Sequence, residues 1–174
     1  MQETVETLNF LLALGGIVLA MTSAFLIFDL YTKRELVPLV EKFGLWIAFL
    51  VTLGSGAMTL LYSEVFGFVP CGLCWLGRIF MYPQIFLTAT ALYLRDKAIA
   101  MYGMVLSVPG LLISLYHHYL QMGGTELIDC PASGKANCAE RILFEFGFMT
   151  FPLLSAILFL FLFCLYFYIW KTRN

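Results

Sequence analysis

Residues 146–170 read FGFMTFPLLSAILFLFLFCLYFYIW and contain no charged residue. A helix needs about 20 mainly apolar residues to cross the roughly 30 Å hydrocarbon core of a bilayer. The stretch therefore meets the length that a membrane span requires. The whole chain is 61% hydrophobic and 12% charged, whereas an average soluble domain is about 45–50% apolar and about 25% charged. This composition predicts an integral membrane protein.

Further charge-free runs lie upstream, and they complete the predicted set of membrane spans. Three of them are long enough, namely Leu8–Phe28, Phe43–Ser63 and Ala98–Thr125. A shorter run, Ile79–Leu94, suffices only if its helix begins near Gly72 and places Arg78 at the interface. The sequence therefore predicts an all-α membrane protein that forms one integral domain over residues 1–174. A four-helix transmembrane bundle over 43–170 follows one extra N-terminal span at 8–30.

The first run could instead be a signal peptide. Its flank carries Glu3 and Glu6 but no Lys or Arg, and its 21 residues exceed the roughly 7–15 apolar residues of a signal peptide. We therefore expect a membrane helix, which brings the number of spans to five.

The distribution of positive charge predicts the orientation of these spans. An odd number of spans puts the termini on opposite sides, and one side then holds seven of the ten Lys and Arg residues: Lys33, Arg34, Lys42, Arg95, Lys97, Lys171 and Arg173. The positive-inside rule places that side in the cytoplasm, with the N-terminus outside and the C-terminus inside. The net charge of −1 gives no sign of nucleic-acid binding.

Four of the five cysteines fall on the outer side in this topology. Cys71 and Cys74 lie at the start of the third span, and Cys130 and Cys138 lie in the last outer loop. Disulfides form and persist outside the cytoplasm. Cys164 stands alone inside the last span, where we expect it to be an inert apolar side chain.

The pair in VPCGLCWLGR (69–78) has a redox interpretation. The first turn of a helix presents unpaired N–H groups and the positive end of the helix dipole, which favour the reactive thiolate form of cysteine. Arg78 follows Cys74 by four residues and shares its helix face. It could stabilise a thiolate or the negative charge that develops on an electron acceptor. Alternatively, Arg78 is an interfacial side chain that extends towards the head groups.

The second pair lies in the polar loop CPASGKANC (130–138). Its disulfide could simply close the loop, or it could be exposed to attack by a partner's thiolate. The four outer cysteines could alternatively form a zinc site, with His117 and His118 as possible ligands. CxxC is half of a common zinc pattern, but the spacing of Cys130 and Cys138 is a poor match to the other half, so we expect no metal. The segment AERILFEFGFM (139–149) has helical periodicity and predicts a short amphipathic helix at the membrane surface, or the beginning of the last span.

Polar residues also lie near the outer end of the fourth span. His117 and Gln121 are four residues apart and share a face. Spacing alone favours polar and aromatic residues that anchor the helix at the interface. The alternative is that they contact a ligand head group beside the cysteines.

Together, CGLCWLGR, the two outer cysteine pairs and HHYLQ resemble the DsbB family of membrane disulfide-bond formation proteins, over roughly residues 43–170. This resemblance implies a multi-pass protein of the bacterial inner (cytoplasmic) membrane that binds a quinone, ubiquinone or menaquinone. It implies a quinone-dependent thiol-disulfide oxidoreductase that reoxidises a DsbA-like thioredoxin-fold oxidase. We expect a monomer, with membrane lipid as its other partner and no nucleic acid.

The resemblance also implies roles for individual residues. Cys71 and Cys74 match the quinone-proximal pair, with Cys74 nearer the ring, and Cys130 and Cys138 match the partner-facing pair, with Cys130 as the site of the mixed disulfide. The implied quinone-binding residues are Cys74, Arg78, His117 and Gln121. The chain departs from the pattern in its extra N-terminal span and in the seven residues that separate Cys130 from Cys138.

Two other functions are weighed against this one. A vitamin K epoxide reductase-like enzyme pairs similar cysteines with a quinone, but there the quinone-proximal CxxC usually follows the loop pair, whereas here it precedes it. The protein could also be a small transporter or scaffold whose disulfides are purely structural. In that case it would bind no quinone, and replacing Arg78 would leave its function unchanged.

Overall fold

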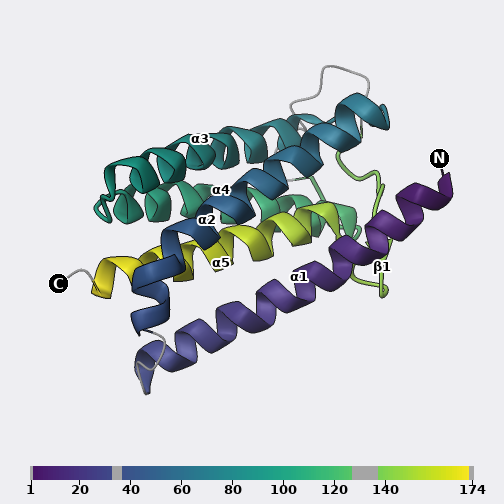
Figure 1. The fold of residues 1–174 in the computed structure, drawn as a ribbon. Coiled ribbons are helices and arrows are strands. Elements are labelled where there is room, and N and C mark those ends of the chain that lie inside the picture. The colour runs from purple at the N-terminus through teal and green to yellow at the C-terminus, as the bar shows by residue number, and fades with distance from the viewer. Residues whose placement is uncertain (1, 33–36, 127–136, 173–174) are drawn as a thin grey trace.

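The computed structural model describes residues 2–32, 37–126 and 137–172. Within these ranges the chain forms five α-helices: α1 (Gln2–Tyr31), α2 (Val37–Leu60), α3 (Gly72–Leu94), α4 (Ile99–Gln121) and α5 (Phe151–Thr172). A π-helical turn, η1 (Leu61–Val65), continues α2. Two short strands, β1 (Phe144–Glu145) and β2 (Met149–Thr150), pair antiparallel before α5. Figure 1 shows the helices lying alongside one another, with the N-terminus near the β1 end and the C-terminus at the opposite end.

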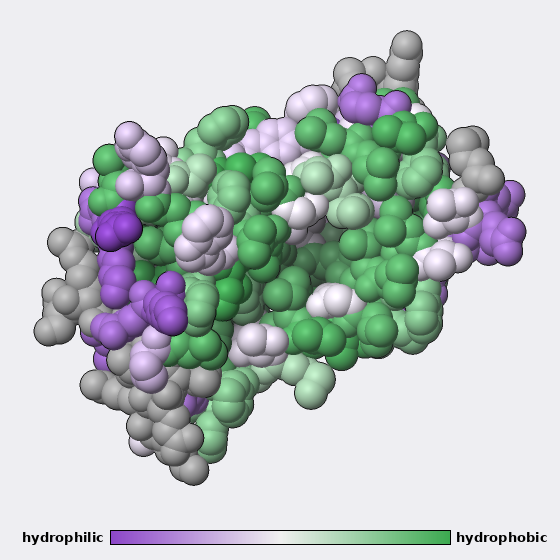
Figure 2. Space-filling view, viewed as in Figure 1, coloured by the Kyte–Doolittle hydropathy of each residue, from purple (hydrophilic) through white to green (hydrophobic). Residues whose placement is uncertain are grey.

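Four of the described helices are long and apolar enough to cross a membrane: α1, α2 with its η1 extension, α4 and α5. Figure 2 shows the matching surface, mostly hydrophobic between two hydrophilic ends. The prediction of a multi-pass all-helical membrane protein is therefore confirmed. α3 does not meet the same apolar criterion, because it carries the buried polar residues Arg78, Gln84 and Thr88. Five crossings and their orientation stay predictions.

The segment before α5 differs from the sequence prediction. The prediction of an amphipathic helix over 139–149 is wrong, because this segment contains β1 and most of the β1–β2 hairpin. The last helix begins at Phe151 rather than at Phe146. Phe146 and Gly147 have φ values of 55° and 78°, in the left-handed region that interrupts a right-handed helix. Pro152 then lies in the first turn of α5, where its missing N–H leaves no hydrogen bond unmade.

α5 forms the centre of the bundle and packs against α1, α2 and α4. It is apolar on all sides, which suits a helix surrounded by others. Small residues let the backbones approach closely, as is common between membrane helices. A Cβ atom added to Gly110 of α4 would lie 2.5 Å from the ring of Phe159, so this glycine fixes the α4–α5 spacing.

Polar contacts attach α1 to the rest of the bundle near both of its ends. Asn9 accepts a hydrogen bond from Tyr62 Oη at 2.6 Å and donates one to the Ile142 carbonyl at 3.2 Å. Near the other end, Tyr168 Oη donates to Asp29 Oδ2 at 2.5 Å. Asn9 and Asp29 are both buried. α1 is therefore packed into the bundle along its length.

The Asp29 contact gives a stability prediction with a matched control. We expect Tyr168→Phe to lower the free energy of unfolding by about 1 kcal/mol, because it removes a buried donor from Asp29 within the membrane. Tyr166 is equally buried on α5, but its hydroxyl has no hydrogen-bond partner within the described part of the chain. Tyr166→Phe should therefore cost nothing. Thermal unfolding in detergent measures both variants, and equal losses would contradict the assignment.

Candidate redox site

The CxxC pair caps the N-terminus of α3. Cys71 is the N-cap residue, and its sulfur accepts a hydrogen bond from the Cys74 backbone N–H at 3.3 Å. The two sulfur atoms lie 2.8 Å apart as free thiols. A disulfide bond of about 2.05 Å needs only a small further approach of the two atoms. The predicted helix start near Gly72 is confirmed, and it places both thiols where the helix dipole favours a thiolate.

His117 of α4 lies between the two cysteine pairs. Its Nε2 is 3.7 Å from Cys71 Sγ and 3.0 Å from the backbone oxygen of Cys138. The side chain is buried, so the interfacial anchor that spacing alone favoured does not describe it. One imidazole nitrogen therefore touches a residue of each pair. These two residues, Cys71 and Cys138, are 67 positions apart in the sequence.

The surroundings of Cys71 stabilise its thiolate. The hydrogen bond from the Cys74 thiol is the main reason that the pKa of Cys71 lies well below its usual value. Hydrogen bonding and charge from His117 lower the pKa further, as does the Cys74 backbone N–H, while burial of Cys71 opposes them. The reduced pair can therefore hold one proton and one negative charge near neutral pH.

This lowered pKa predicts the pH dependence of alkylation. Only the thiolate reacts, so in the reduced protein the rate of Cys71 alkylation by iodoacetamide should stay high as the pH falls below about 8.5, the ordinary pKa of a thiol. Cys74→Ala removes the largest cause, so the midpoint of the profile should move to higher pH. Mass spectrometry of the Cys71 peptide measures the rate. A wild-type midpoint at the ordinary thiol value would contradict the prediction.

Arg78 points into the bundle one turn after Cys74. Its Nη2 donates to the backbone oxygen of Thr59 in α2 at 2.9 Å, and its guanidinium carbon lies 5.1 Å from the centre of the Trp75 ring. The side chain is only 8% exposed. The hydrogen bond to Thr59 uses one of the five N–H donors of the guanidinium. Arg78 is therefore held inside the bundle rather than extended towards the head groups.

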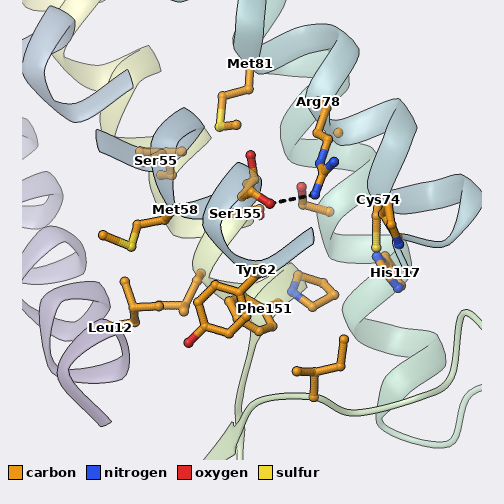
Figure 3. Close-up of a pocket in the computed structure, with 18 of the residues that line it drawn as sticks. Leu12, Ser55, Met58, Tyr62, Cys74, Arg78, Met81, His117, Phe151 and Ser155 are labelled. Atoms are coloured by element: carbon orange, nitrogen blue, oxygen red, sulfur yellow. Dashed lines mark hydrogen bonds between the residues drawn. The ribbon is translucent and has the colours of Figure 1, made fainter. Parts of the chain in front are cut away.

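A cavity of about 490 Å³ joins these residues, and all five helices contribute to its wall. The predicted site residues within the described part of the chain that line it are Cys71, Cys74, Arg78, His117 and Gln121. Figure 3 shows Arg78, Cys74 and His117 on one side and Leu12 of α1 on the other, with Tyr62 and Phe151 between them. The remaining wall is mostly apolar.

Gln121 has an unusual hydrogen-bond environment in this cavity. Its Nε2 donates to the Glu140 carbonyl at 2.6 Å, and its own backbone oxygen accepts from Arg141 Nε at 2.5 Å. Its Oε1 is buried without a hydrogen-bond partner in the described residues. Buried acceptors are nearly always satisfied. This oxygen is therefore free to accept a hydrogen bond from a molecule bound in the cavity.

Cys138 lies in the same apolar cluster as the CxxC pair. It is disulfide-bonded, almost fully buried, and part of an apolar cluster with Cys71, Leu73 and Leu120. Its predicted companion Cys130 lies outside the described residues. The short loop therefore does not keep Cys138 away from Cys71.

The candidate metal ligands are few. The sulfur atoms of Cys71 and Cys74 and a nitrogen of His117 lie within 4.8 Å of one another. A structural zinc site takes four ligands, and Cys138 is held in a disulfide. The disulfide at Cys138 does not fit a zinc site that uses all four cysteines, and the expectation of no metal stays a prediction.

Sequence reasoning missed the cavity residues contributed by α1, η1 and α5. These include Leu12, Gly15, Tyr62, Phe151 and Leu158. Apolar side chains face lipid and cavity alike in a membrane helix, so hydrophobicity does not separate the two groups. The glycines of α1 were the available signal, because small residues in a membrane helix allow another helix to approach closely.

Residues 41–169 match the family model described as disulfide bond formation protein DsbB. A relative from Oceanobacillus iheyensis, named "Probable disulfide formation protein", is 36% identical over 132 residues, which cover 75% of this chain and 88% of that protein. The "SPbeta prophage-derived disulfide bond formation protein B" of Bacillus subtilis is 36% identical over 124 residues, covering 71% of this chain and 82% of that protein. No solved structure matches the chain significantly.

Proposed function

Because the chain belongs to the DsbB family of disulfide bond formation proteins, and is thus a membrane thiol oxidoreductase, we propose that it reoxidises a DsbA-like thioredoxin-fold dithiol oxidase and transfers the electrons to a membrane quinone. One observation carries the proposal: His117 touches both Cys71 and Cys138 beside an apolar cavity that also contains Arg78. A dithiol relay and an acceptor site are thereby adjacent.

The cavity fits a quinone. Its volume of about 490 Å³ lies within the roughly 300–1,000 Å³ of small-molecule sites, which are mostly apolar with a few placed polar groups. Arg78 offers N–H donors for a carbonyl oxygen, and the unpaired Oε1 of Gln121 offers an acceptor for a hydroxyl group. A bound ubiquinone or menaquinone would supply an acceptor for two electrons and two protons.

Thiol–disulfide exchange supplies the electrons. A partner thiolate attacks Cys130 in a Cys130–Cys138 disulfide, forming a mixed disulfide and releasing the Cys138 thiolate. The second partner thiolate then attacks the partner sulfur of that mixed disulfide, which leaves an oxidised partner and a Cys130/Cys138 dithiol. This dithiol reduces a Cys71–Cys74 disulfide by the same exchange and becomes a disulfide again.

The residues around the inner pair handle charge and protons. When the Cys71–Cys74 disulfide re-forms, the pair gives up two electrons and the Cys74 thiol proton, and the second proton is the one that Cys71 lost when its thiolate formed. His117, with Nε2 beside Cys71, is placed to hold one of these protons. Arg78 stabilises negative charge in the cavity beside Cys74, where the low dielectric strengthens its effect. The chain contributes positioning and electrostatics, while the acceptor contributes the redox chemistry.

We place the protein in the bacterial cytoplasmic membrane as a monomer, with five spans, the N-terminus outside and both cysteine pairs on the extracytoplasmic side. After reduction, a membrane-impermeant thiol reagent should label Cys130 in intact cells. Labelling only after lysis would invert this topology.

The activity test uses the purified full chain with a reduced thioredoxin-fold oxidase. Addition of decylubiquinone or menaquinone-4 should oxidise the partner catalytically, with one quinone reduced for each partner disulfide formed. Without quinone, oxidation should stop once the disulfides of the enzyme are used. A partner that stays reduced would indicate a scaffold with structural disulfides and would refute the proposal.

A further inference from the structure

The N-terminal helix is part of the cavity wall. Five α1 residues line it: Leu11, Leu12, Gly15, Gly16 and Leu19. The family match begins at residue 41, so α1 lies outside the region that this chain shares with the family model. The site geometry of this chain therefore includes a wall that the shared region does not supply.

Two adjacent glycines shape this wall in different ways. A Cβ atom added to Gly16 would lie 2.2 Å from Leu154 Cδ2, so Gly16 allows close approach of α1 to α5. A Cβ atom added to Gly15 would meet no atom within 4 Å, although Gly15 lines the cavity. Gly15 therefore leaves space open that a side chain would occupy.

Asn9 holds α1 against the outer rim of the cavity. Its side chain bonds to Tyr62 of η1 and to the backbone of Ile142, and both of these residues line the cavity. The Tyr62 ring in turn packs edge-on against Phe151, with centroids 4.7 Å apart. The position of α1 is thus coupled to three other segments around the same space.

The wall supplied by α1 differs chemically from the opposite one. Its lining residues are leucines and glycines, whereas Arg78, His117 and Gln121 come from α3 and α4. Polar atoms of a bound molecule belong near Arg78 and Gln121, which leaves its apolar part for α1. Figure 3 shows this separation, with Leu12 on the side away from Arg78 and Cys74.

We propose that α1 is the specificity-determining wall of the cavity, and that Leu12 and Gly15 contact the hydrocarbon tail of the bound quinone. This inference rests on the proposed function, because it assigns the wall to a part of the same ligand. α1 thereby selects ligands by their tail, while the reacting ring is held by residues of the shared bundle.

The test measures equilibrium binding to the oxidised full chain, so that neither cysteine pair reacts with the probes. The change of the thermal unfolding midpoint with ligand concentration gives each affinity. Two pairs of probes differ in the tail: decylubiquinone against its tailless dimethoxy-methyl-benzoquinone ring, and menaquinone-4 against menadione. Gly15→Phe should weaken binding of the tailed member by about tenfold, as expected when roughly two methylene groups lose their burial. The tailless member should change by less than about twofold.

Two further phenylalanine variants provide controls. Val18→Phe adds the same ring to α1 at a lipid-facing position, 57% exposed and outside the cavity lining, and should leave both affinities unchanged. Gly54→Phe is a positive control. It adds the ring to α2 at a cavity-lining position where a Cβ atom also meets nothing within 4 Å, and it should weaken quinone binding. If Gly15→Phe does not fold, as judged by the ligand-free midpoint, Gly15→Leu makes the same test with a smaller side chain.

The outcomes separate the two proposals. If neither quinone stabilises the wild type, the proposed function fails and this inference fails with it. If the wild type binds and the Gly15 variant behaves like Val18→Phe, the inference alone is overturned. An equal loss for tailed and tailless probes would overturn the assignment of α1 to the tail.

Discussion

Cys74→Ser is expected to abolish quinone reduction by the purified protein, leaving only the uncatalysed background. The Cys71 and Cys74 sulfurs lie 2.8 Å apart at the start of α3 and line the cavity. Serine has nearly the same shape but cannot form a disulfide, so the inner pair can no longer be oxidised or reduced as a unit. The loss should therefore appear in the maximal rate, not only at low quinone concentration. The decrease of quinone absorbance in the presence of reduced partner measures it.

Cys164→Ser is the matched control for this experiment. Cys164 is also a free, buried thiol, but it lies on α5 outside the cavity lining. Its replacement should leave the rate within about twofold of wild type, because it touches none of the reacting groups. Quinone reduction that survives Cys74→Ser would show that the inner pair has been assigned wrongly. A complete loss in the Cys164 variant would show that the assay reports folding.

Replacement of Arg78 is expected to have the next largest effect. Arg78→Met keeps most of the side-chain volume. It removes the only Lys or Arg side chain among the described residues that line the cavity. Loss of one preorganised donor for developing negative charge costs about 10²–10³ in rate, or roughly 2.7–4 kcal/mol. We therefore expect kcat/KM for decylubiquinone to fall by about 10²-fold or more. Steady-state kinetics at saturating reduced partner measure this.

Two further variants distinguish charge from packing at this position. Arg78→Lys restores a positive charge without the planar fork of donors, so it should recover part of the lost activity. Arg95→Met removes an exposed arginine at the C-terminus of α3 and should leave quinone kinetics unchanged. If Arg78→Met lowers only thermal stability, with kcat/KM for quinone unaltered, the Thr59 contact is structural and the proposed role is wrong.

Much of the helical architecture follows from local sequence. The charge-free runs predicted α1, α2, α4 and α5, because the transfer of apolar residues into lipid depends mainly on composition and length. The start of α3 near Gly72 was predicted because Ile79–Leu94 alone is too short to cross the membrane. The residues before α5 were mispredicted, because their apolar spacing suits a helix while Phe146 and Gly147 adopt left-handed backbone conformations.

The candidate site could be predicted only in part from the sequence. Arg78 follows Cys74 by one helix turn, so its proximity to the CxxC motif is a local property of α3. The position of His117 between Cys71 and Cys138 depends on packing α4 against α3 and against the segment after the last loop. Helical spacing along α4 alone carried no information about either contact.

By itself the sequence determined that this chain is a multi-helix membrane protein with two cysteine pairs, because hydropathy and short motifs are properties of neighbouring residues. Only the tertiary structure decided which apolar residues face the cavity, that Cys138 packs beside Cys71, and that α1 closes one wall. In lipid, the same leucine suits an outer surface and an inner wall equally well. Helix packing and the few buried polar contacts, such as Asn9 with Tyr62, make that choice.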